Sequence, residues 1–305
     1  MSLLSLVKGR RGASGFGYAS TAEEVTADLD LSNQVFLVTG VNSGLGQESA
    51  RVFAERGAKI LGAARTLEKA TDACRAFGDN TVPVACELSE PESVRDCIAE
   101  VRKVGVQLDV ILCNAGIMAL PERQVKHGQE LQFLTNHIGH FILVTGLLDL
   151  LAPRGRVVVL SSMAHKMAPS GGIQFDDLSF ERGYSAWKAY GQSKLANLLF
   201  ARALSRRLEK GQTANAVHPG VIGTDLWRHM GTAARVVAPL AGAVALKNVH
   251  EGAATQCFVA TRPDLAHVNG EYFSDCNQAK SSALGADRDL SERLWKVTED
   301  IVARL

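Results

Sequence analysis

From residue 34 onward, two patterns of apolar and polar residues alternate along the chain. Short runs of apolar, β-prone residues end at small or polar residues, and the longer stretches between them carry apolar positions at helical spacing. The short runs predict strands at 34–39, 59–63, 82–86, 110–113, 156–160, 215–217 and 271–273. The longer stretches predict helices at 47–56, 90–104, 130–151, 187–208 and 251–260.

The regular alternation of strand and helix indicates the fold class. Continuous apolar strands are buried on both faces, and right-handed crossovers place helices on both sides of a parallel sheet. We therefore expect residues 31–305 to form a single α/β domain, a Rossmann-type doubly wound parallel sheet. Residues 1–30 form a separate, glycine-rich arm, which we expect to pack on the surface of this domain. Within the arm, the stretch from Ser20 to Val25 resembles a capping box that leads a short helix.

Composition narrows the class of protein. Of 305 residues, 46% are hydrophobic and 21% are charged, which excludes a disordered or fibrous chain. The net charge of +1 gives no support to nucleic-acid binding. The six cysteines form no C-x-x-C pair and predict reduced thiols in a cytoplasmic compartment. We expect no membrane span, because no run of 18 apolar residues occurs, and no secretory signal, because the N-terminal charges follow the apolar run.

A glycine-rich turn follows the first predicted strand. It reads Gly40-Val41-Asn42-Ser43-Gly44-Leu45-Gly46 and leads directly into a helix. Its three glycines allow a sharp turn and let a pyrophosphate approach the helix N-terminus, whose free N–H groups and dipole favour an anion. The alternative is a tight turn with close helix–strand packing. The position between the first strand and the first helix favours a dinucleotide.

The end of the second predicted strand distinguishes between the two nicotinamide dinucleotides. Enzymes that use NAD place a carboxylate there, about 20 residues beyond the glycines, to bind the ribose 2′-OH. Here Arg65 stands 19 residues after Gly46, and the next carboxylate is Glu68. A guanidinium suits a 2′-phosphate through charge-assisted hydrogen bonds, so NADP(H) is favoured. The alternative for Arg65 is a solvated charge at the end of a strand.

Three further side chains indicate acid–base chemistry. Tyr190 and Lys194 are four residues apart on one face of a predicted helix, and a neighbouring ammonium stabilises a phenolate. By itself this spacing is also typical of a surface pair. Ser162 directly follows the fifth predicted strand, where its hydroxyl can donate to a carbonyl oxygen. Its alternative is a helix cap, but no helix is predicted to begin nearby.

These motifs, in this order, resemble the short-chain dehydrogenase/reductase family over residues 31–280. The resemblance is carried by the glycine-rich turn, Asn114-Ala115-Gly116, Ser162, Tyr190 with Lys194, and Pro219-Gly220. The stretches 131–141, 161–165, 193–197, 218–221 and 270–276 resemble the retinol-dehydrogenase-like branch, near the WW-domain-containing oxidoreductases. The arm is similar to that of short-chain dehydrogenases associated with the protein translocon of the chloroplast inner envelope.

The resemblance implies a catalytic tetrad of Asn136, Ser162, Tyr190 and Lys194. It implies that Tyr190 exchanges the proton with the substrate oxygen and that Ser162 holds that oxygen. Lys194 would lower the pKa of Tyr190 and bind the nicotinamide ribose, while Asn136 would position a water. Besides Arg65, the implied cofactor contacts are Gly40, Asn42, Ser43, Gly44, Leu45, Gly46, Glu87, Leu88, Asn114, Ala115, Gly116, Tyr190, Lys194, Pro219, Gly220, Val221, Ile222 and Thr224.

Two positions depart from the family pattern. Glu87 stands where the family usually has Asp near the adenine, and Cys113 replaces an Asn. Neither change removes a catalytic group, and we expect Cys113 to be a buried apolar residue. We expect His137 and His140, three residues apart, to pack between helices, and no metal site is expected.

The expected substrate contacts are Ser162, Met163, Tyr190, Leu226 and Trp227. The last two belong to 226–246, where this fold usually carries the substrate lid. One hypothesis is that the lid is apolar because the substrate is lipophilic, with Arg228, Arg235 and Lys247 resting on a membrane surface. Ordinary packing or a dimer contact is an equal alternative.

The sequence therefore predicts an NADP(H)-dependent alcohol dehydrogenase or carbonyl reductase for a lipophilic or aromatic substrate. A homodimer that pairs the helices near 130–151 and 187–208 is the expected assembly. The alternative function is a regulatory or scaffold protein that binds NADP(H) and senses redox state. The complete tetrad favours the enzyme.

Overall fold

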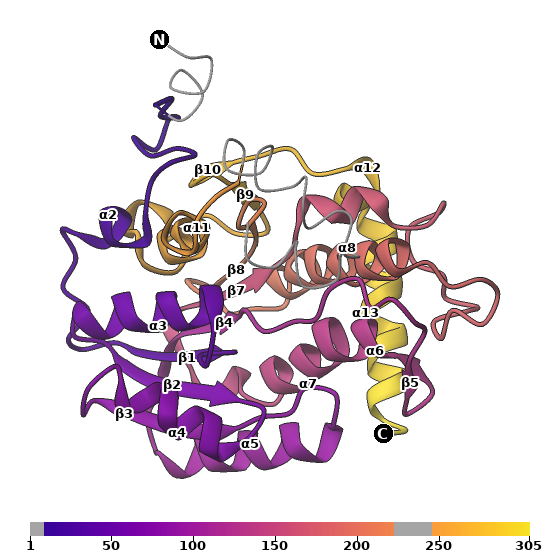
Figure 1. The fold of residues 1–305 in the computed structure, drawn as a ribbon, viewed down its shortest axis with the longest axis horizontal. Coiled ribbons are helices and arrows are strands. Elements are labelled where there is room, and N and C mark those ends of the chain that lie inside the picture. The colour runs from indigo at the N-terminus through magenta and orange to yellow at the C-terminus, as the bar shows by residue number, and fades with distance from the viewer. Residues whose placement is uncertain (1–8, 223–245) are drawn as a thin grey trace, which may run out of the picture.

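One eight-stranded sheet, in the order β10-β9-β8-β7-β4-β1-β2-β3, organises the chain (Figure 1). The structure is a computed structural model that describes residues 9–222 and 246–305. Neighbouring strands from β3 to β9 are parallel, and β10 pairs with β9 in the antiparallel sense. The strands are β1 (Val35–Thr39), β2 (Lys59–Ala64), β3 (Thr81–Ala85), β4 (Leu108–Cys113), β7 (Leu151–Leu160), β8 (Thr213–His218), β9 (Tyr272–Ser274) and β10 (Asn277–Gln278). A separate hairpin joins β5 (Val125–Lys126) to β6 (Gln129–Glu130).

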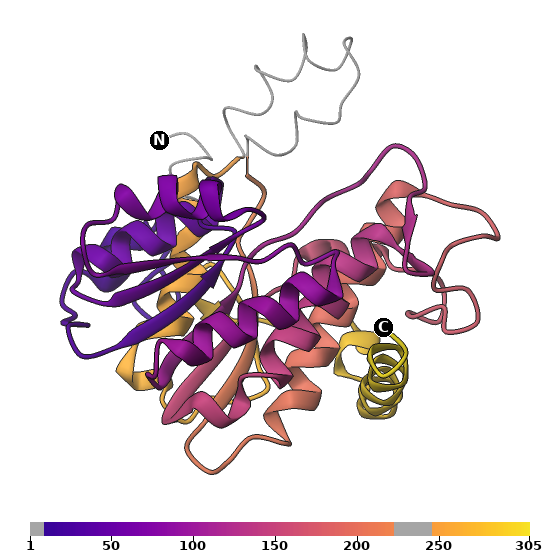
Figure 2. The same ribbon diagram turned by 90° about the horizontal axis from the view of Figure 1, so that it is seen from below.

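Helices cover both faces of the sheet (Figure 2). They are α2 (Ala22–Thr26), α3 (Gly44–Glu55), α4 (Leu67–Arg75), α5 (Pro91–Lys103), α6 (Leu131–Phe133), α7 (Gly139–Thr145), α8 (Ala186–Ser205), α11 (Val249–Thr261), α12 (Ala283–Ala286) and α13 (Arg288–Val302). A π-helical turn spans Leu134–Ile138, and short 3-10 helices span Leu148–Leu150, Met163–Met167 and Pro263–Leu265. Strand side chains alternate between two cores, so that Leu37 of β1 faces α5, α7 and α8 while Phe36 and Val38 face α3, α4 and α11. The doubly wound parallel fold predicted from the sequence is confirmed.

Each predicted strand is present, with bounds that differ at the ends. The prediction of a single helix over 130–151 is wrong. The helical stretch ends at Thr145, with Gly146, a poor helix former, as its C-cap. Gly146 also packs closely on α5, since a Cβ there would lie 2.5 Å from Ile98 Cδ1. Leu151 then begins β7 and pairs with Leu108, which is a long-range contact that apolar periodicity does not reveal.

Two well-formed helices, α4 and α13, were not predicted. Thr66 caps α4 by accepting a hydrogen bond from Lys69 N, and Asp287 caps α13. Helix α13 lies against α8 (Figure 1), where Trp295 stacks on Phe200 with ring centroids 5.8 Å apart. It therefore covers one side of the helices that were expected to pair two copies.

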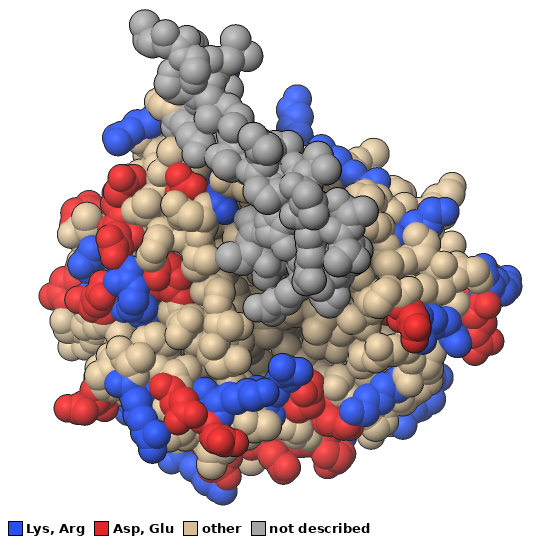
Figure 3. All heavy atoms as spheres, in the orientation of Figure 1, with Lys and Arg blue, Asp and Glu red and all other residues tan. Residues whose placement is uncertain are grey.

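The arm has the short helix that its capping box predicts. Thr21 accepts from Glu24 N, and the Glu24 carboxylate accepts from Thr21 N. Helix α2 packs on α11 and α3, and the ion pair between Glu23 and Arg51, at 2.6 Å, joins it to α3. None of the helices in the described ranges is long and apolar enough to cross a membrane. On the face seen in Figure 3, acidic and basic side chains stand next to one another.

Candidate active site

The glycine-rich turn forms the N-terminus of α3. Gly40 and Gly44 have positive φ values of 75° and 57°, which residues with a Cβ rarely adopt. A Cβ at Gly46 would lie 2.3 Å from both Asn114 Nδ2 and Gly40 O, so this residue allows close helix–strand packing. Ser43 precedes the helix without a side-chain cap, which leaves the first N–H groups of α3 available to an anion.

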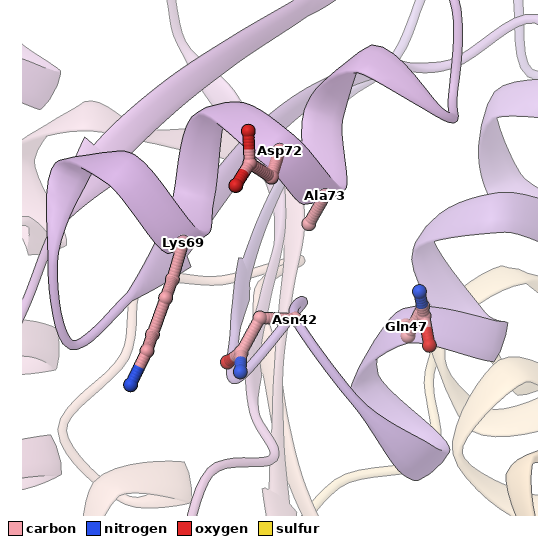
Figure 4. Close-up of a pocket in the computed structure, with 5 residues that line it drawn as sticks. All are labelled: Asn42, Gln47, Lys69, Asp72 and Ala73. Carbon is pink, nitrogen blue, oxygen red and sulfur yellow. The ribbon is translucent and has the colours of Figure 1, made fainter.

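Arg65 follows β2 and is exposed. Within residues 9–222 and 246–305, no carboxylate forms an ion pair with it. Asn42 of the turn and Lys69 of α4 line one pocket together with Gln47, Asp72 and Ala73 (Figure 4). Sequence reasoning missed Lys69, although it stands four residues after Arg65, where the first turn of a capped helix brings it back toward the glycines.

Asn114 is tied into the protein and supports the turn. Its backbone N–H donates to Thr39 Oγ1 at 3.0 Å, and its Nδ2 donates to Thr39 O at 2.9 Å. Gln256 of α11, fully buried, donates from Nε2 to Asn114 Oδ1, Leu45 O and Ser49 Oγ. This glutamine, which the sequence analysis did not single out, connects α11 to both sides of the turn.

Glu87 and Leu88 follow β3 at the same edge of the sheet. The Glu87 carboxylate accepts hydrogen bonds from both the backbone N–H and the hydroxyl of Ser89. Leu88 is buried, and its carbonyl oxygen would lie 2.3 Å from a Cβ at Gly139. Both hydrogen bonds reach Oε1, so the carboxylate is held in place by its own turn.

Tyr190 and Lys194 lie in the first half of α8. Lys194 is 3% exposed, and its ammonium lies 5.7 Å from the centroid of the Tyr190 ring and donates to Leu160 O at 2.9 Å. Burial lowers the pKa of Lys194 to about 8. The alternative of a surface pair is wrong, because Tyr190 is only 9% exposed and Lys194 is enclosed.

Ser162 stands between β7 and a 3-10 helix that begins at Met163. Its Oγ accepts from Ala164 N at 3.1 Å, so the expectation that no helix begins nearby is wrong. Because the hydroxyl accepts in this cap, its proton remains available for donation. Gly191 brings α8 onto this segment, since a Cβ there would lie 2.7 Å from Met167 C. The residue next to Tyr190 therefore touches the turn that carries Ser162.

Asn136 lies in the π-helical turn and faces Lys194 across Gly116. Its side chain is held by Ile117 N, Ile117 O and Ser193 Oγ. A Cβ at Gly116 would lie 2.9 Å from Asn136 Oδ1 and 3.5 Å from Lys194 Nζ. Such π-helical turns occur frequently at functional sites.

His140 joins Asn136 to the first strand. Its Nδ1 lies 3.0 Å from Asn136 O and its Nε2 lies 2.9 Å from Thr39 Oγ1. Burial lowers the pKa of His140 to about 4, so the ring is neutral and donates to the carbonyl from Nδ1. His137 is also buried and contacts Thr298 Oγ1 of α13 at 3.0 Å. Both histidines thus pack between elements, as predicted.

The segment after β8 completes the edge of the sheet. His218 Nδ1 accepts from Met163 N and Gly220 N, which links the Ser162 turn to Pro219 and Gly220. Ile222 is buried and Val221 is exposed. Thr224, Leu226, Trp227, Arg228 and Arg235 lie outside the described residues.

Lys247 is not available to a membrane surface, which corrects one expectation. Its side chain is fully buried, and Nζ pairs with Asp275 Oδ1 at 2.6 Å.

All six cysteines are free and buried, Cys113 among them. No group of three or more His, Cys, Asp or Glu side chains in the described part of the chain is arranged to hold a metal ion.

Comparisons with known proteins agree with this geometry. A family model described as short chain dehydrogenase matches residues 34–175. Over the full length of both chains, this chain is 41% identical to the short-chain dehydrogenase TIC 32 B, chloroplastic, of Brassica napus. The chain belongs to the short-chain dehydrogenase/reductase family. It is therefore an oxidoreductase that binds a nicotinamide cofactor.

Other relatives extend the comparison. Retinol dehydrogenase 14 of Mus musculus is 36% identical over 90% of this chain and 87% of its own length. A solved structure of an uncharacterised protein from Mycobacterium paratuberculosis superposes with a TM-score of 0.75 at 32% identity, covering 94% of this chain and 98% of that one. These similarities confirm the predicted retinol-dehydrogenase-like branch of the family.

Proposed function

We propose that this short-chain dehydrogenase/reductase uses NADP(H) to interconvert a lipophilic or aromatic alcohol and its aldehyde or ketone. The observation that carries the proposal is the convergence of Ser162, Tyr190, Lys194 and Asn136 beside an uncapped helix N-terminus. A site of this kind combines an anion cradle with a hydroxyl donor, a phenol and an enclosed ammonium. That set suits proton transfer to or from a substrate oxygen.

The preference for NADP(H) rests on Arg65. The glycine cradle, which a Cβ at Gly46 would fill, fits a pyrophosphate, and Arg65 lies where the 2′-substituent of the adenosine ribose is bound in this fold. An exposed guanidinium without a carboxylate partner in the described ranges can bind a 2′-phosphate through two charge-assisted hydrogen bonds. Lys69, four residues further along the chain, lines a pocket with Asn42 of the glycine-rich turn, and Asp72 lines the same pocket.

Each catalytic residue has a separate role. Tyr190 gives the proton to, or takes it from, the substrate oxygen, and Ser162 donates a hydrogen bond to that oxygen. The Lys194 ammonium favours the phenolate form of Tyr190 electrostatically, and Asn136 holds a water that continues the proton path. When bound, the nicotinamide supplies or accepts the hydride.

An apolar substrate is supported by the residues around this site. Met163, Met167, Trp187 and Val221 are among the large hydrophobic side chains with at least 36% exposure. They come from the segments that carry Ser162, Tyr190 and Gly220, and the Trp187 ring lies 6.1 Å from that of Tyr190. Exposed apolar side chains in the segments that carry the site favour an apolar substrate.

The alternative is a redox-sensing regulatory or scaffold protein that binds NADP(H) with little turnover. The similarity to a dehydrogenase named TIC 32 motivates it, and the complete set of four catalytic side chains opposes it. A panel of aromatic and long-chain carbonyls with NADPH separates the two functions. The enzyme oxidises NADPH with at least one of these compounds, whereas the scaffold binds NADPH without oxidising it.

Two variants test the assigned residues in the same panel. Arg65→Ala is expected to weaken NADPH binding about 10- to 100-fold and to leave NADH binding unchanged, because only charge-assisted bonds to the 2′-phosphate are lost. Tyr190→Phe is expected to bind NADPH normally and to lose turnover. An unchanged preference for NADPH in Arg65→Ala refutes the assignment of Arg65.

Assembly and location stay predictions. A homodimer through α7 and α8 would have to form beside α13, which buries Phe141 and Phe200 under Trp295. Light scattering of the purified protein tests it. Six free thiols fit a reducing compartment such as the cytoplasm, although the relatives named above include chloroplastic proteins.

A further inference from the structure

The N-terminal arm reaches a buried lysine, Lys247, that packs on Gly220. The resemblance to the family implies that residues 219–222 contact the nicotinamide end of the cofactor. Tyr18 lies in the arm, and its ring centroid is 4.8 Å from Lys247 Nζ. Burial, followed by the carboxylates of Asp275 and Glu251, raises the pKa of Tyr18, so acidic groups face the same cluster. An ammonium at this distance from an aromatic face is attracted to it.

The opposite side of Lys247 meets the turn between β9 and β10. Asp275, which pairs with Lys247 at 2.6 Å, and Cys276 both have positive φ values, 50° and 59°. The arm holds this turn as well. Asn277 accepts from Ser14 N at 3.1 Å and donates to Phe16 O at 3.1 Å. The arm therefore contacts Lys247 through Tyr18 and, through Asn277, the turn that carries its partner Asp275.

Lys247 also touches the backbone that follows β8. A Cβ at Gly220 would lie 2.6 Å from Lys247 Cδ, so the aliphatic part of the lysine packs directly on that glycine. Lys247 N donates to Val221 O at 2.9 Å, and Ile222 forms a parallel bridge with Lys247. One side chain thus connects the arm, the hairpin turn and residues 220–222.

We propose that the arm is a positioning element of the nicotinamide site, acting from Tyr18 through Lys247 and Asp275 on the backbone of Gly220–Ile222. The inference rests on the proposed function in one respect, since it takes residues 220–222 as contacts of the nicotinamide half of the cofactor. Lys247 and Tyr18 are positioning residues. They hold the backbone that contacts the cofactor and do not contact the cofactor themselves.

The physical reason is the position of the lysine charge. A fully buried ammonium is costly unless it is paired, and here one carboxylate and one aromatic face enclose it. While both partners are present, the lysine stem is fixed against Gly220. When the charge or the ring is removed, the lysine stem is no longer held against Gly220. The backbone at 220–222 then gains conformational entropy, and cofactor binding must order it again at a cost in affinity.

The experiment compares two ligands on the full-length protein by titration calorimetry. NADPH contacts the whole site, whereas adenosine 2′,5′-bisphosphate contacts only the half near Arg65. Lys247→Met keeps an apolar stem against Gly220 and removes the charge, and Tyr18→Leu removes the aromatic face. Glu23→Gln is the matched control, because it breaks the Glu23–Arg51 contact between arm and core away from Lys247.

We expect Lys247→Met and Tyr18→Leu to bind NADPH about tenfold more weakly than the wild type, with binding of the bisphosphate unchanged. The unchanged bisphosphate affinity also shows that the variants are folded. Glu23→Gln is expected to bind both ligands like the wild type. The inference is overturned if both variants bind NADPH like the wild type, or if they lose affinity for both ligands equally. A wild type that binds neither ligand contradicts the proposed function itself.

Discussion

Replacing Lys194 by Met is expected to stabilise the folded protein while abolishing turnover. The ammonium is enclosed in α8, and burial lowers its pKa from 10.5 to about 8. At about 1.4 kcal/mol per pH unit, this difference corresponds to about 3 kcal/mol by which the folded state disfavours the charged lysine at pH 7. A methionine of similar length carries no charge and removes this cost.

The loss of one hydrogen bond offsets part of the gain. Lys194 Nζ donates to Leu160 O at 2.9 Å, and a hydrogen bond from a charged group contributes about 1.5–3 kcal/mol. Asn197 Nδ2 donates to the same oxygen at 3.0 Å, so the carbonyl keeps a partner in the variant. We therefore expect the free energy of unfolding to rise by about 1 kcal/mol at pH 7.

The effect has a characteristic dependence on pH. Because the folded pKa lies below the unfolded one, the stability associated with neutral Lys194 is fully present above about pH 10.5. It is lost as the pH falls from there to about 8. The wild type should therefore gain stability between pH 8 and 10.5, and the methionine variant should not share this gain. The difference between the two proteins is largest below pH 8.

Urea unfolding of the cofactor-free protein at pH 7 and pH 9.5 measures both quantities. Lys188→Met is the control, since Lys188 lies on the same helix but is exposed. The control should leave the unfolding free energy and the turnover nearly unchanged. The reasoning is refuted if Lys194→Met is less stable than the wild type at pH 7, or if the difference does not depend on pH.

Three further predictions test other parts of the site. Gly46→Ala places a Cβ 2.3 Å from Asn114 Nδ2 and Gly40 O, so calorimetry should show NADPH affinity reduced by about tenfold or more. His140→Leu removes a group whose folded pKa is about 4, below its ordinary value of 6.5. The stability that depends on neutral His140 is present above pH 6.5 and is lost as the pH falls toward 4. Urea unfolding should therefore show that the variant's free energy of unfolding depends less steeply on pH between 6.5 and 4, by up to about 1.4 kcal/mol per pH unit. Trp187→Ala removes an exposed ring beside Tyr190, and steady-state kinetics should show KM raised about tenfold for bulky apolar carbonyls but not for small ones.

Apolar periodicity predicted the strands well because they form one buried parallel sheet. In such a sheet every strand is apolar on both faces, and its carboxyl end meets the same crevice, which is why Asn114, Ser162 and Pro219 could be assigned to one edge. Periodicity failed at residues 146–151. The apolar run there fits a helix equally well, but the pairing of Leu151 with Leu108 places Leu151 in a strand.

The residues that support the site were largely invisible in the sequence. Gln256 and His140 are buried polar residues on helices, and the partners named above are 142 and 101 residues away along the chain. A buried polar side chain needs a partner, but only the tertiary structure shows which one it finds. For Lys247 the sequence suggested an exposed side chain, whereas the structure buries it. It was grouped with surface-basic residues because of its charge, yet a carboxylate and an aromatic ring enclose it.

The docking of the arm also has a consequence for the order in which the chain folds. Ser14 binds Asn277, 263 residues further along the chain, so this part of the arm cannot dock until residue 277 has been made. Closing so long a loop is slow and comes after the local strand–helix units have formed. A newly made chain can therefore form its first strand–helix units early, but the arm docks only after Asn277 has been made. A fusion partner attached at residue 1 would act on that last step.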